Sequence, residues 1–96
     1  MPTVVLVAVD SEETRAEAIA VAELLRGRGI ACEVAPAADK FGKQIRYADR
    51  RGIPFVWFGG REAGEVKDLR SGDQHSADPQ AWRPPEEDRR PAVRWS

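Results

Sequence analysis

Apolar residues fall into runs whose spacing predicts strands and helices in alternation. Residues 3–9 form one continuous β-branched run, which is typical of a strand covered on both faces. A stripe of apolar residues at helical spacing follows, and Gly27 and Gly29 end it. Its members are Ala18, Val21, Ala22 and Leu25. Residues 30–34 then alternate as in a short second strand, so the first third of the chain indicates a parallel β-α-β unit.

A second helix is predicted over residues 40–51, with Gly52 as its C-terminal stop. Phe41, Ile45 and Ala48 recur at helical spacing, so we expect them on its buried face. This helix would lead from the second strand into a third one.

The second half of the chain is rich in strand and turn signals. Residues 55–58 form a short buried strand, and the glycines at 59–60 permit a sharp turn after it. A fourth strand is predicted over 65–69, with a turn at 71–72. Residues 73–74 are expected to begin a short fifth strand paired with the fourth. The pattern as a whole predicts an α/β domain with about five strands.

Proline divides the chain into a domain over residues 1–78 and a tail over residues 79–96. The tail prolines are Pro79, Pro84, Pro85 and Pro91. Because no helix of useful length fits between them, we expect an extended or irregular segment. Trp82 or Trp95 would pin this tail to the domain.

Composition adds limits on class and location. The chain has 96 residues, is 42% hydrophobic and 32% charged, and carries a net charge of −1, which suits one soluble domain without a strong global field. Cys32 is the only cysteine, which excludes an internal disulfide and suits the cytoplasm. The apolar run at residues 4–9 is too short to span a bilayer, so no membrane partner is expected.

Catalytic patterns are weak in this sequence, and we expect no reaction at this chain alone. The only histidine, His75, lies in a polar turn with Ser71, Asp73 and Ser76, too local a cluster to build a Ser-His-Asp triad. No glycine-rich phosphate loop follows the first strand.

Positive charge is concentrated on the second predicted helix. Its basic residues are Lys40, Lys43, Arg46, Arg50 and Arg51, with Asp49 as the only acid beside them. Lys43, Arg46 or Tyr47, and Arg50 would share a solvent-facing stripe that can follow a phosphate backbone. The alternative, a helix face charged only for solubility, is left open by charge alone.

Two motifs resemble a known family. They are Lys-Phe-Gly-Lys-Gln-Ile-Arg-Tyr-Ala-Asp at 40–49, continued by Arg-Arg-Gly-Ile-Pro-Phe-Val at 50–56, and Val-Lys-Asp-Leu-Arg-Ser-Gly-Asp-Gln at 66–74. In this order they resemble the anticodon-binding domain of class II aminoacyl-tRNA synthetases, closest to the C-terminal domain of the histidyl-tRNA synthetase branch. The resemblance covers residues 3 to about 76.

The resemblance implies an α/β fold of three layers, in which a mixed, mostly parallel sheet of about five strands is flanked by helices. It also implies the C-terminal part of a histidine-tRNA ligase, which positions tRNA for a separate catalytic domain. ATP and histidine would bind that catalytic domain, so no cofactor is expected in this one. The implied partners are the anticodon loop of a histidine tRNA and the catalytic domain of the same parent chain.

Site residues carry over from three regions of the family: the start of the second helix, the turn after the third strand, and the strand beyond it. In this sequence they are Lys40, Phe41, Lys43, Gln44, Arg61, Glu62, Lys67 and Arg70. Glu62 would accept hydrogen bonds from a guanine edge, and Lys67 would donate to a base carbonyl or a phosphate. Lys40, Lys43 and Gln44 would position the RNA backbone.

Two other functions compete with RNA binding. One is a free-standing regulatory or dimerisation module that keeps the fold without RNA binding; a homodimer is a candidate state that the sequence leaves open. The other is a flavodoxin-like domain for a small molecule. The acidic residues at 10–13 weigh against the second because they would repel a phosphate at the end of the first strand.

Overall fold

One five-stranded sheet organises residues 2–85, the part of the chain that the computed structural model describes. The elements are β1 (Val5–Val7), the 3-10 turn η1 (Glu12–Thr14), α1 (Arg15–Gly27), β2 (Cys32–Val34), α2 (Phe41–Arg50), β3 (Phe55–Phe58), β4 (Gly64–Asp68) and β5 (Gln74–Ala77). The strand order is β2-β1-β3-β4-β5. The pairs β1–β2 and β1–β3 are parallel, whereas β3–β4 and β4–β5 are antiparallel. The predicted α/β class and mixed five-stranded sheet are therefore confirmed.

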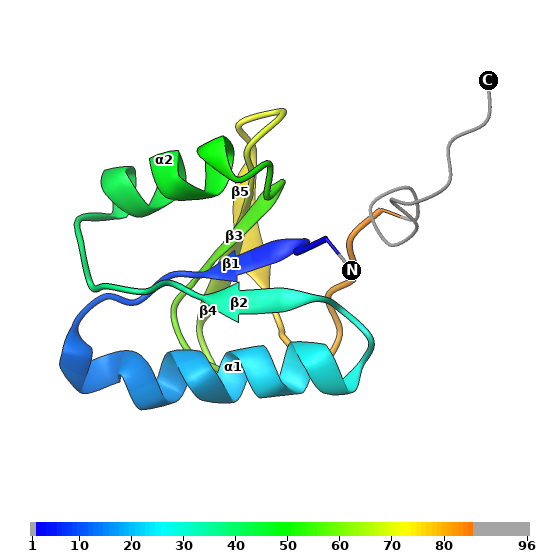
Figure 1. Ribbon diagram of the computed structural model, residues 1–96. Coiled ribbons are helices and arrows are strands. Elements are labelled where there is room, and N and C mark those ends of the chain that lie inside the picture. Colours follow the sequence, from blue (N-terminus) through cyan, green and yellow to red (C-terminus); the bar gives the residue numbers. More distant parts are fainter. Residues whose placement is uncertain (1, 86–96) are drawn as a thin grey trace, which may run out of the picture.

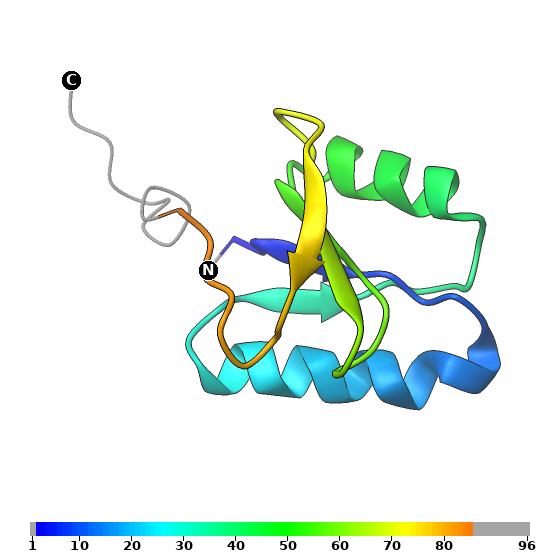
Figure 2. The same ribbon diagram turned by 180° about the vertical axis from the view of Figure 1, so that it is seen from behind.

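The two helices cover opposite faces of the sheet, which makes three layers (Figure 1). Helix α1 connects β1 to β2 on one side of the central strand, and α2 crosses back to β3 on the other side. Both parallel crossovers therefore put the carboxyl ends of β1, β2 and β3 at one edge of the sheet. The β4–β5 hairpin forms the edge of the sheet opposite β2, and it is in front when the molecule is seen from behind (Figure 2).

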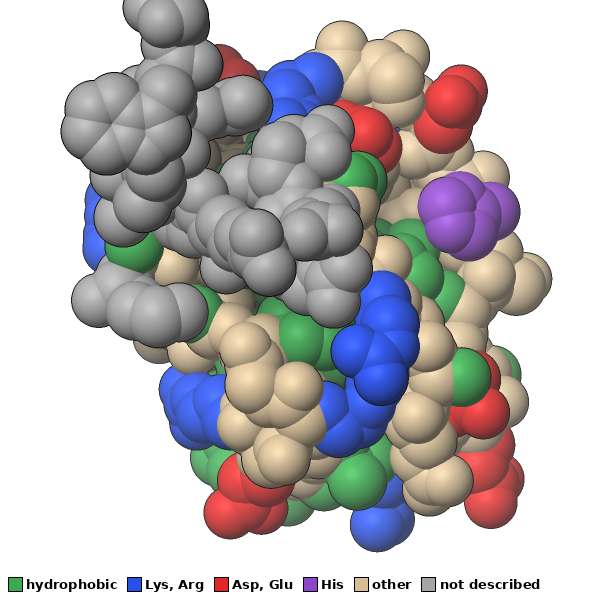
Figure 3. All heavy atoms as spheres, turned by 90° about the vertical axis from the view of Figure 1, so that its right-hand side faces the viewer, with side chains coloured by type: hydrophobic (Ala, Val, Ile, Leu, Met, Phe, Trp, Pro, Cys, Tyr) green, Lys and Arg blue, Asp and Glu red, His purple; other side chains and the backbone are tan. Residues whose placement is uncertain are grey.

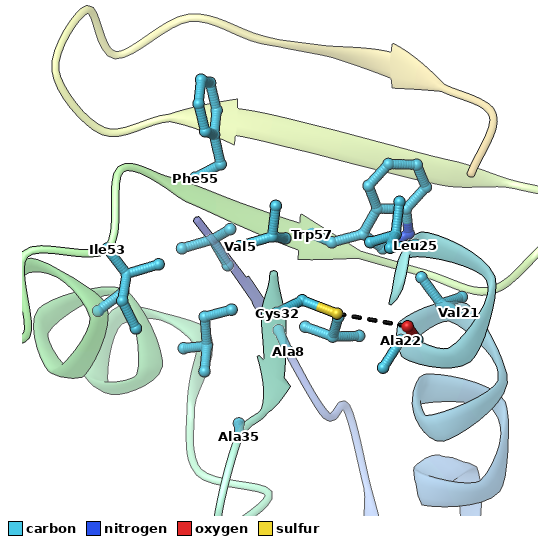
Figure 4. Close-up of a cluster of buried hydrophobic side chains, with 14 of the residues drawn as sticks. Val5, Ala8, Val21, Ala22, Leu25, Cys32, Ala35, Ile53, Phe55 and Trp57 are labelled. Carbon is cyan, nitrogen blue, oxygen red and sulfur yellow. Dashed lines mark hydrogen bonds between the residues drawn. The ribbon is translucent and has the colours of Figure 1, made fainter. Parts of the chain in front are cut away.

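Alternation along the strands decides which residues face each helix. Trp57 is fully buried and lies beside Leu25 and Val21 of α1 (Figure 4). Leu6 and Val56, one position out of phase with Trp57, are paired with each other and face α2. Burial of both faces explains why the first and third strands are continuous apolar runs.

The paired part of the first strand is shorter than the apolar run that contains it. Although Val4 to Val9 are all buried, only Val5–Val7 pair as a strand. Beyond that ladder, the Ala8 N–H donates to the carbonyl of Trp57 at 2.8 Å, and the Val9 N–H donates to a side chain of α2 at 2.9 Å. The expected strand over 3–9 is therefore an extended segment in which only Val5–Val7 pair with neighbouring strands, and some backbone hydrogen bonds of the remainder go to other partners.

The buried face of α2 differs from the expectation. Ala48 is buried and Ile45 is half-buried, but Phe41 is 39% exposed. Gln44 takes the buried position instead, one turn before Ala48. Phe41 is the first residue of α2, and its ring packs edge-on against Phe58 at a centroid distance of 4.9 Å.

The segment after β5 folds back onto the α1 side of the sheet. The Trp82 ring packs edge-on against Phe55 and Trp57, with centroids at 5.3 and 6.0 Å. The Arg28 guanidinium donates to the carbonyls of Pro79 and Trp82, both at 2.8 Å. The expectation that Trp82 anchors this segment is confirmed, whereas Trp95 lies outside the described residues.

Candidate nucleic-acid interface

The first turn of α2 presents two exposed lysines at the carboxyl edge of the sheet. Lys40 is the N-cap residue and makes no side-chain capping bond. Lys43 approaches Asp39 at 3.7 Å, but both side chains are exposed, so this ion pair holds the ammonium group only weakly. Both ammonium groups are thus available to an anionic ligand.

The expected basic stripe on α2 faces solvent, since Lys43, Arg46 and Arg50 are all exposed. Arg46 and Arg50 are exposed and form no ion pair within residues 2–85. Arg51 does not join them, because its guanidinium bonds Glu33 of β2 at 3.1 Å and lies over the Tyr47 ring at 5.4 Å. Arg51 was not part of the predicted stripe, and of the two alternatives at its middle position Arg46 is exposed and Tyr47 is half-buried.

A shallow hollow of about 70 Å³ runs beside these cations, between α2 and the loop after β2. Residues 35–37 and 39 line it from the loop, and four residues line it from the helix: Lys43, Gln44, Tyr47 and Arg50. An aromatic ring between two cations is a surface that suits a phosphate with an attached base.

The sheet is open beyond α2, because this helix packs against β3 and leaves the β4–β5 hairpin uncovered on that side (Figures 1 and 2). Lys67 is paired with Val56, and Glu65 with Phe58, so both side chains lie on the α2 side. Gln74 of β5 is on the same face and donates to Glu65 Oε1 at 3.0 Å. A row of polar side chains therefore continues from the Phe41–Phe58 ring pair.

Sequence reasoning missed Phe58, Glu65 and Gln74 as candidate site residues. The signal was there for Glu65: residues 64–68 alternate between buried and solvent-facing positions, so the polar side chains on either side of Val66 are expected to face out. Phe58 was assigned to a fully buried strand, but the structure leaves it half-buried beside α2.

Arg61 lies on the α1 side of the molecule, away from the lysines of α2. Its backbone N–H and Nε donate to Glu17 Oε1 of α1 at 3.0 and 3.1 Å. The backbone bond, followed by the guanidinium bond, lowers the pKa of Glu17 below its ordinary value. Glu62, the next residue, is exposed and makes no hydrogen bond among the described residues.

Arg70 also lies on the α1 side, where its guanidinium stacks over the Phe55 ring at 5.5 Å. Asp68 accepts from the backbone N–H groups of Arg70 and Ser71 at 2.9 and 3.4 Å. Burial acts to raise the pKa of Asp68, but these bonds and the Arg70 charge outweigh it and lower the pKa. Arg70 thus belongs to the turn that joins β4 to β5.

Gln44 was expected to position RNA, but the structure places its side chain inside the protein. It is 3% exposed, and its amide bonds the backbone of Val9 and Asp39. A side chain with both polar atoms occupied in this way has no group left for a phosphate.

Four of the eight expected site residues lie on the α2 side of the sheet: Lys40, Phe41, Lys43 and Lys67. The Lys67 ammonium group donates to the carbonyl of Gly72, in the turn between β4 and β5, at 3.5 Å. Arg61 and Arg70 contact α1 and Phe55 instead. Figure 3 shows the end of the molecule opposite the first turn of α2, where both helices finish. Lys and Arg side chains are interspersed there with neutral and acidic ones, and His75 of the edge strand β5 is exposed.

Other kinds of site find little support in the described part of the chain. No group of three or more histidine, cysteine or acidic residues there could hold a metal ion. A hollow of about 170 Å³ at the carboxyl ends of β1 and β3 carries the carboxylates of Asp10 and Glu17, which oppose phosphate binding. None of the helices described could cross a membrane.

A family model described as "Anticodon binding domain" matches residues 3–80. The chain belongs to this family. The resemblance carried by residues 40–56 and 66–74 is thereby confirmed, and it extends through β5 to the turn that follows.

Relatives of this anticodon-binding domain are histidine-tRNA ligases. It is 62% identical to the enzyme of Cutibacterium acnes and 61% identical to that of Micrococcus luteus, in each case over 97% of this chain. Among solved structures, histidyl-tRNA synthetase from Nostoc sp. PCC 7120 matches 82% of the chain with a TM-score of 0.76 and 27% identity. The domain spans 22% and 21% of the two curated relatives and 20% of the Nostoc chain, so about a fifth of their length.

Proposed function

We propose that this domain binds the anticodon loop of a histidine tRNA, as the C-terminal part of a histidine-tRNA ligase. One observation carries the proposal: the exposed lysines at the start of α2 lie beside a ring pair and an open, polar sheet face. The identity to histidine-tRNA ligases over nearly the whole chain supports the choice of tRNA. On the same grounds, the active site for ATP and histidine belongs to the catalytic domain of the parent protein, and this domain holds no cofactor.

The two kinds of group suit the two parts of an unpaired nucleotide. Lys40, Lys43 and Arg46 offer exposed cations for phosphates, which supply much of the affinity but little sequence information. Unstacked bases are recognised by stacking on aromatic rings and by hydrogen bonds to their edges. Phe41 offers an exposed ring for stacking, and Lys67 offers a donor on the adjoining strand.

The direct test is a titration of the 96-residue chain with a fluorescent stem-loop that carries a GUG anticodon, with base-swapped loops as controls. Each phosphate contact to unpaired RNA contributes roughly 0.7 to the slope of log affinity against log salt. Lys40→Ala and Arg46→Ala should each reduce that slope by about this amount.

Arg83→Ala is the matched control for this titration. It removes the same charge from an exposed residue of the segment after β5, and it should leave the slope unchanged. Equal and negligible binding of all stem-loops would end the proposal for the isolated domain.

The same titration separates RNA binding from a regulatory or dimerisation role. A domain of that kind would bind the GUG loop and the base-swapped loops equally weakly, and its mass in sedimentation would rise with concentration as a homodimer forms. A cytoplasmic location is part of the proposal, because a tRNA ligase works where translation occurs, and the reduced, buried Cys32 thiol is consistent with it.

A further inference from the structure

Gln44 is the buried polar side chain that links α2 to the end of β1. It is 3% exposed, and within residues 2–85 it is the only buried residue with a polar or charged side chain. Its Oε1 accepts from the Val9 N–H at 2.9 Å, and its Nε2 donates to the Val9 carbonyl at 2.8 Å. A further bond runs from Nε2 to the carbonyl of Asp39 at 2.6 Å. Both amide hydrogens and the amide oxygen are therefore occupied by the backbone.

Two sets of hydrogen bonds tie α2 to the sheet, and Gln44 supplies the one nearest the first turn. Near the other end of the helix, the Tyr47 hydroxyl and the Arg51 guanidinium donate to Glu33 of β2 at 3.2 and 3.1 Å. Ala48 is the other buried residue of the helix, and Ile45 and Tyr47 are half-buried. Apolar contacts of this kind are non-directional, so they resist separation of the helix from the sheet more than rotation. Hydrogen bonds weaken steeply when their angles change, so the three bonds of Gln44 supply the directional restraint at the first turn of α2.

The restraint acts on the turn that carries the exposed cations. Asp39, whose carbonyl Gln44 holds, immediately precedes the N-cap residue Lys40. The Lys40 carbonyl in turn accepts from the backbone N–H groups of Lys43 and Gln44 at 2.9 and 3.1 Å. Successive residues of a helix point about 100° apart, so a small rotation of α2 redirects both lysines.

We propose that Gln44 is a positioning residue for RNA binding, which holds the first turn of α2 so that Lys40, Phe41 and Lys43 face the same ligand. This inference rests on the proposed function. It replaces the direct RNA contact expected from the sequence with an action through neighbouring residues. Gln44 touches no RNA in this account.

The test compares Gln44→Met with a variant that loses stability elsewhere. Methionine has a similar shape but makes none of the three bonds. Val21→Ala removes buried apolar atoms from α1, on the other face of the sheet, and is the matched control for loss of stability. Urea unfolding of each variant first shows that it is folded under the titration conditions. If Gln44→Met is not, Gln44→Asn replaces it, since its shorter side chain cannot span the same atoms.

The readout is the salt dependence of binding to the GUG stem-loop. If two lysines lose their phosphate contacts, the slope of log affinity against log salt should fall by about 1.4. For a variant and a parental chain that bind equally at about 1 M salt, this means about 25-fold weaker binding by the variant at about 0.1 M salt. Val21→Ala should keep the parental slope. A Gln44 variant that is folded and keeps both the parental affinity and the parental slope overturns the inference.

A double-mutant cycle shows whether Gln44 acts through a lysine. Lys43→Ala should weaken binding clearly in the parental chain and much less in the Gln44→Met background, because the lysine is already misplaced there. Equal effects in both backgrounds would mean independent action and would overturn the inference while leaving the proposed function intact. A parental chain that binds no stem-loop would refute the proposed function, and this inference with it.

Discussion

Gly64, the first residue of β4, is a position where one added methyl group should destabilise the fold. A Cβ built on Gly64 overlaps Cζ2 of the Trp57 indole and lies 2.8 Å from Cε2 and 2.9 Å from Nε1. Carbon atoms in contact are normally about 3.5–4.0 Å apart, so the ring or the strand would have to move by roughly 1 Å. Trp57 cannot yield easily, because it is fully buried under α1 and also contacts Trp82.

Overpacking of this kind typically costs about 1–3 kcal/mol. For a domain of this size each kcal/mol lowers the melting temperature by roughly 4–8 °C, so Gly64→Ala should melt clearly below the parental protein. The glycine has no positive φ, so the loss would come from the contact with Trp57 rather than from backbone strain. Thermal unfolding followed by circular dichroism measures the shift.

Gly42→Ala supplies the matched control, with the opposite sign. Its Cβ would meet one atom within 4 Å, Nη1 of Arg46 at 3.8 Å, and alanine stabilises a helix by about 0.5–1 kcal/mol relative to glycine. A melting temperature of Gly64→Ala equal to or above that of the parental protein would refute this reading of the β3–β4 packing.

Three further predictions concern ionisation, thiol reactivity and the segment after β5. Because its folded-state pKa is lowered, Glu17 stabilises the fold above its ordinary pKa of 4.5 and loses that contribution as the pH falls through the folded value. Glu17→Gln should therefore lower the urea midpoint at pH 7, and the difference should shrink below pH 4.5; a constant difference would contradict the role of the Arg61 bonds. Burial raises the pKa of the Cys32 thiol, so iodoacetamide should alkylate it slowly in the native protein and rapidly in urea, and equal rates would be inconsistent with its burial. Trp82→Ala should lower the free energy of unfolding by about 2 kcal/mol through lost contacts with Phe55, whereas an unchanged urea midpoint would show that the segment is not packed.

Periodicity and turn chemistry were sufficient to predict most of the fold. The strand over 55–58 and the helix near 40–51 follow from apolar spacing and from the glycine that ends the helix, because those signals are local. The pairing of β5 with β4 follows from the turn between them. Local patterns do not report whether extended chain continues a ladder, which is why the first strand was expected to be longer than Val5–Val7.

The candidate site was harder to predict, because its geometry depends on contacts between distant residues. The family resemblance assigned Gln44 to the RNA backbone, yet its amide completes the backbone hydrogen bonds of Val9, 35 positions earlier. Arg61 was expected beside the anticodon, but Glu17, 44 positions earlier, holds it against α1. Lys43 was placed correctly on the outer side of α2, since its surroundings are local to that helix.

The central claim is that unpaired nucleotides contact the α2 side of the sheet. Amide chemical-shift mapping of the isotope-labelled chain during titration with the GUG stem-loop tests it most directly. The account predicts that the shifts concentrate at Lys40, Phe41, Lys43 and Lys67. Shifts concentrated on the outer face of α1, around Ile19 and Glu23, or no shifts at saturating RNA, would contradict it.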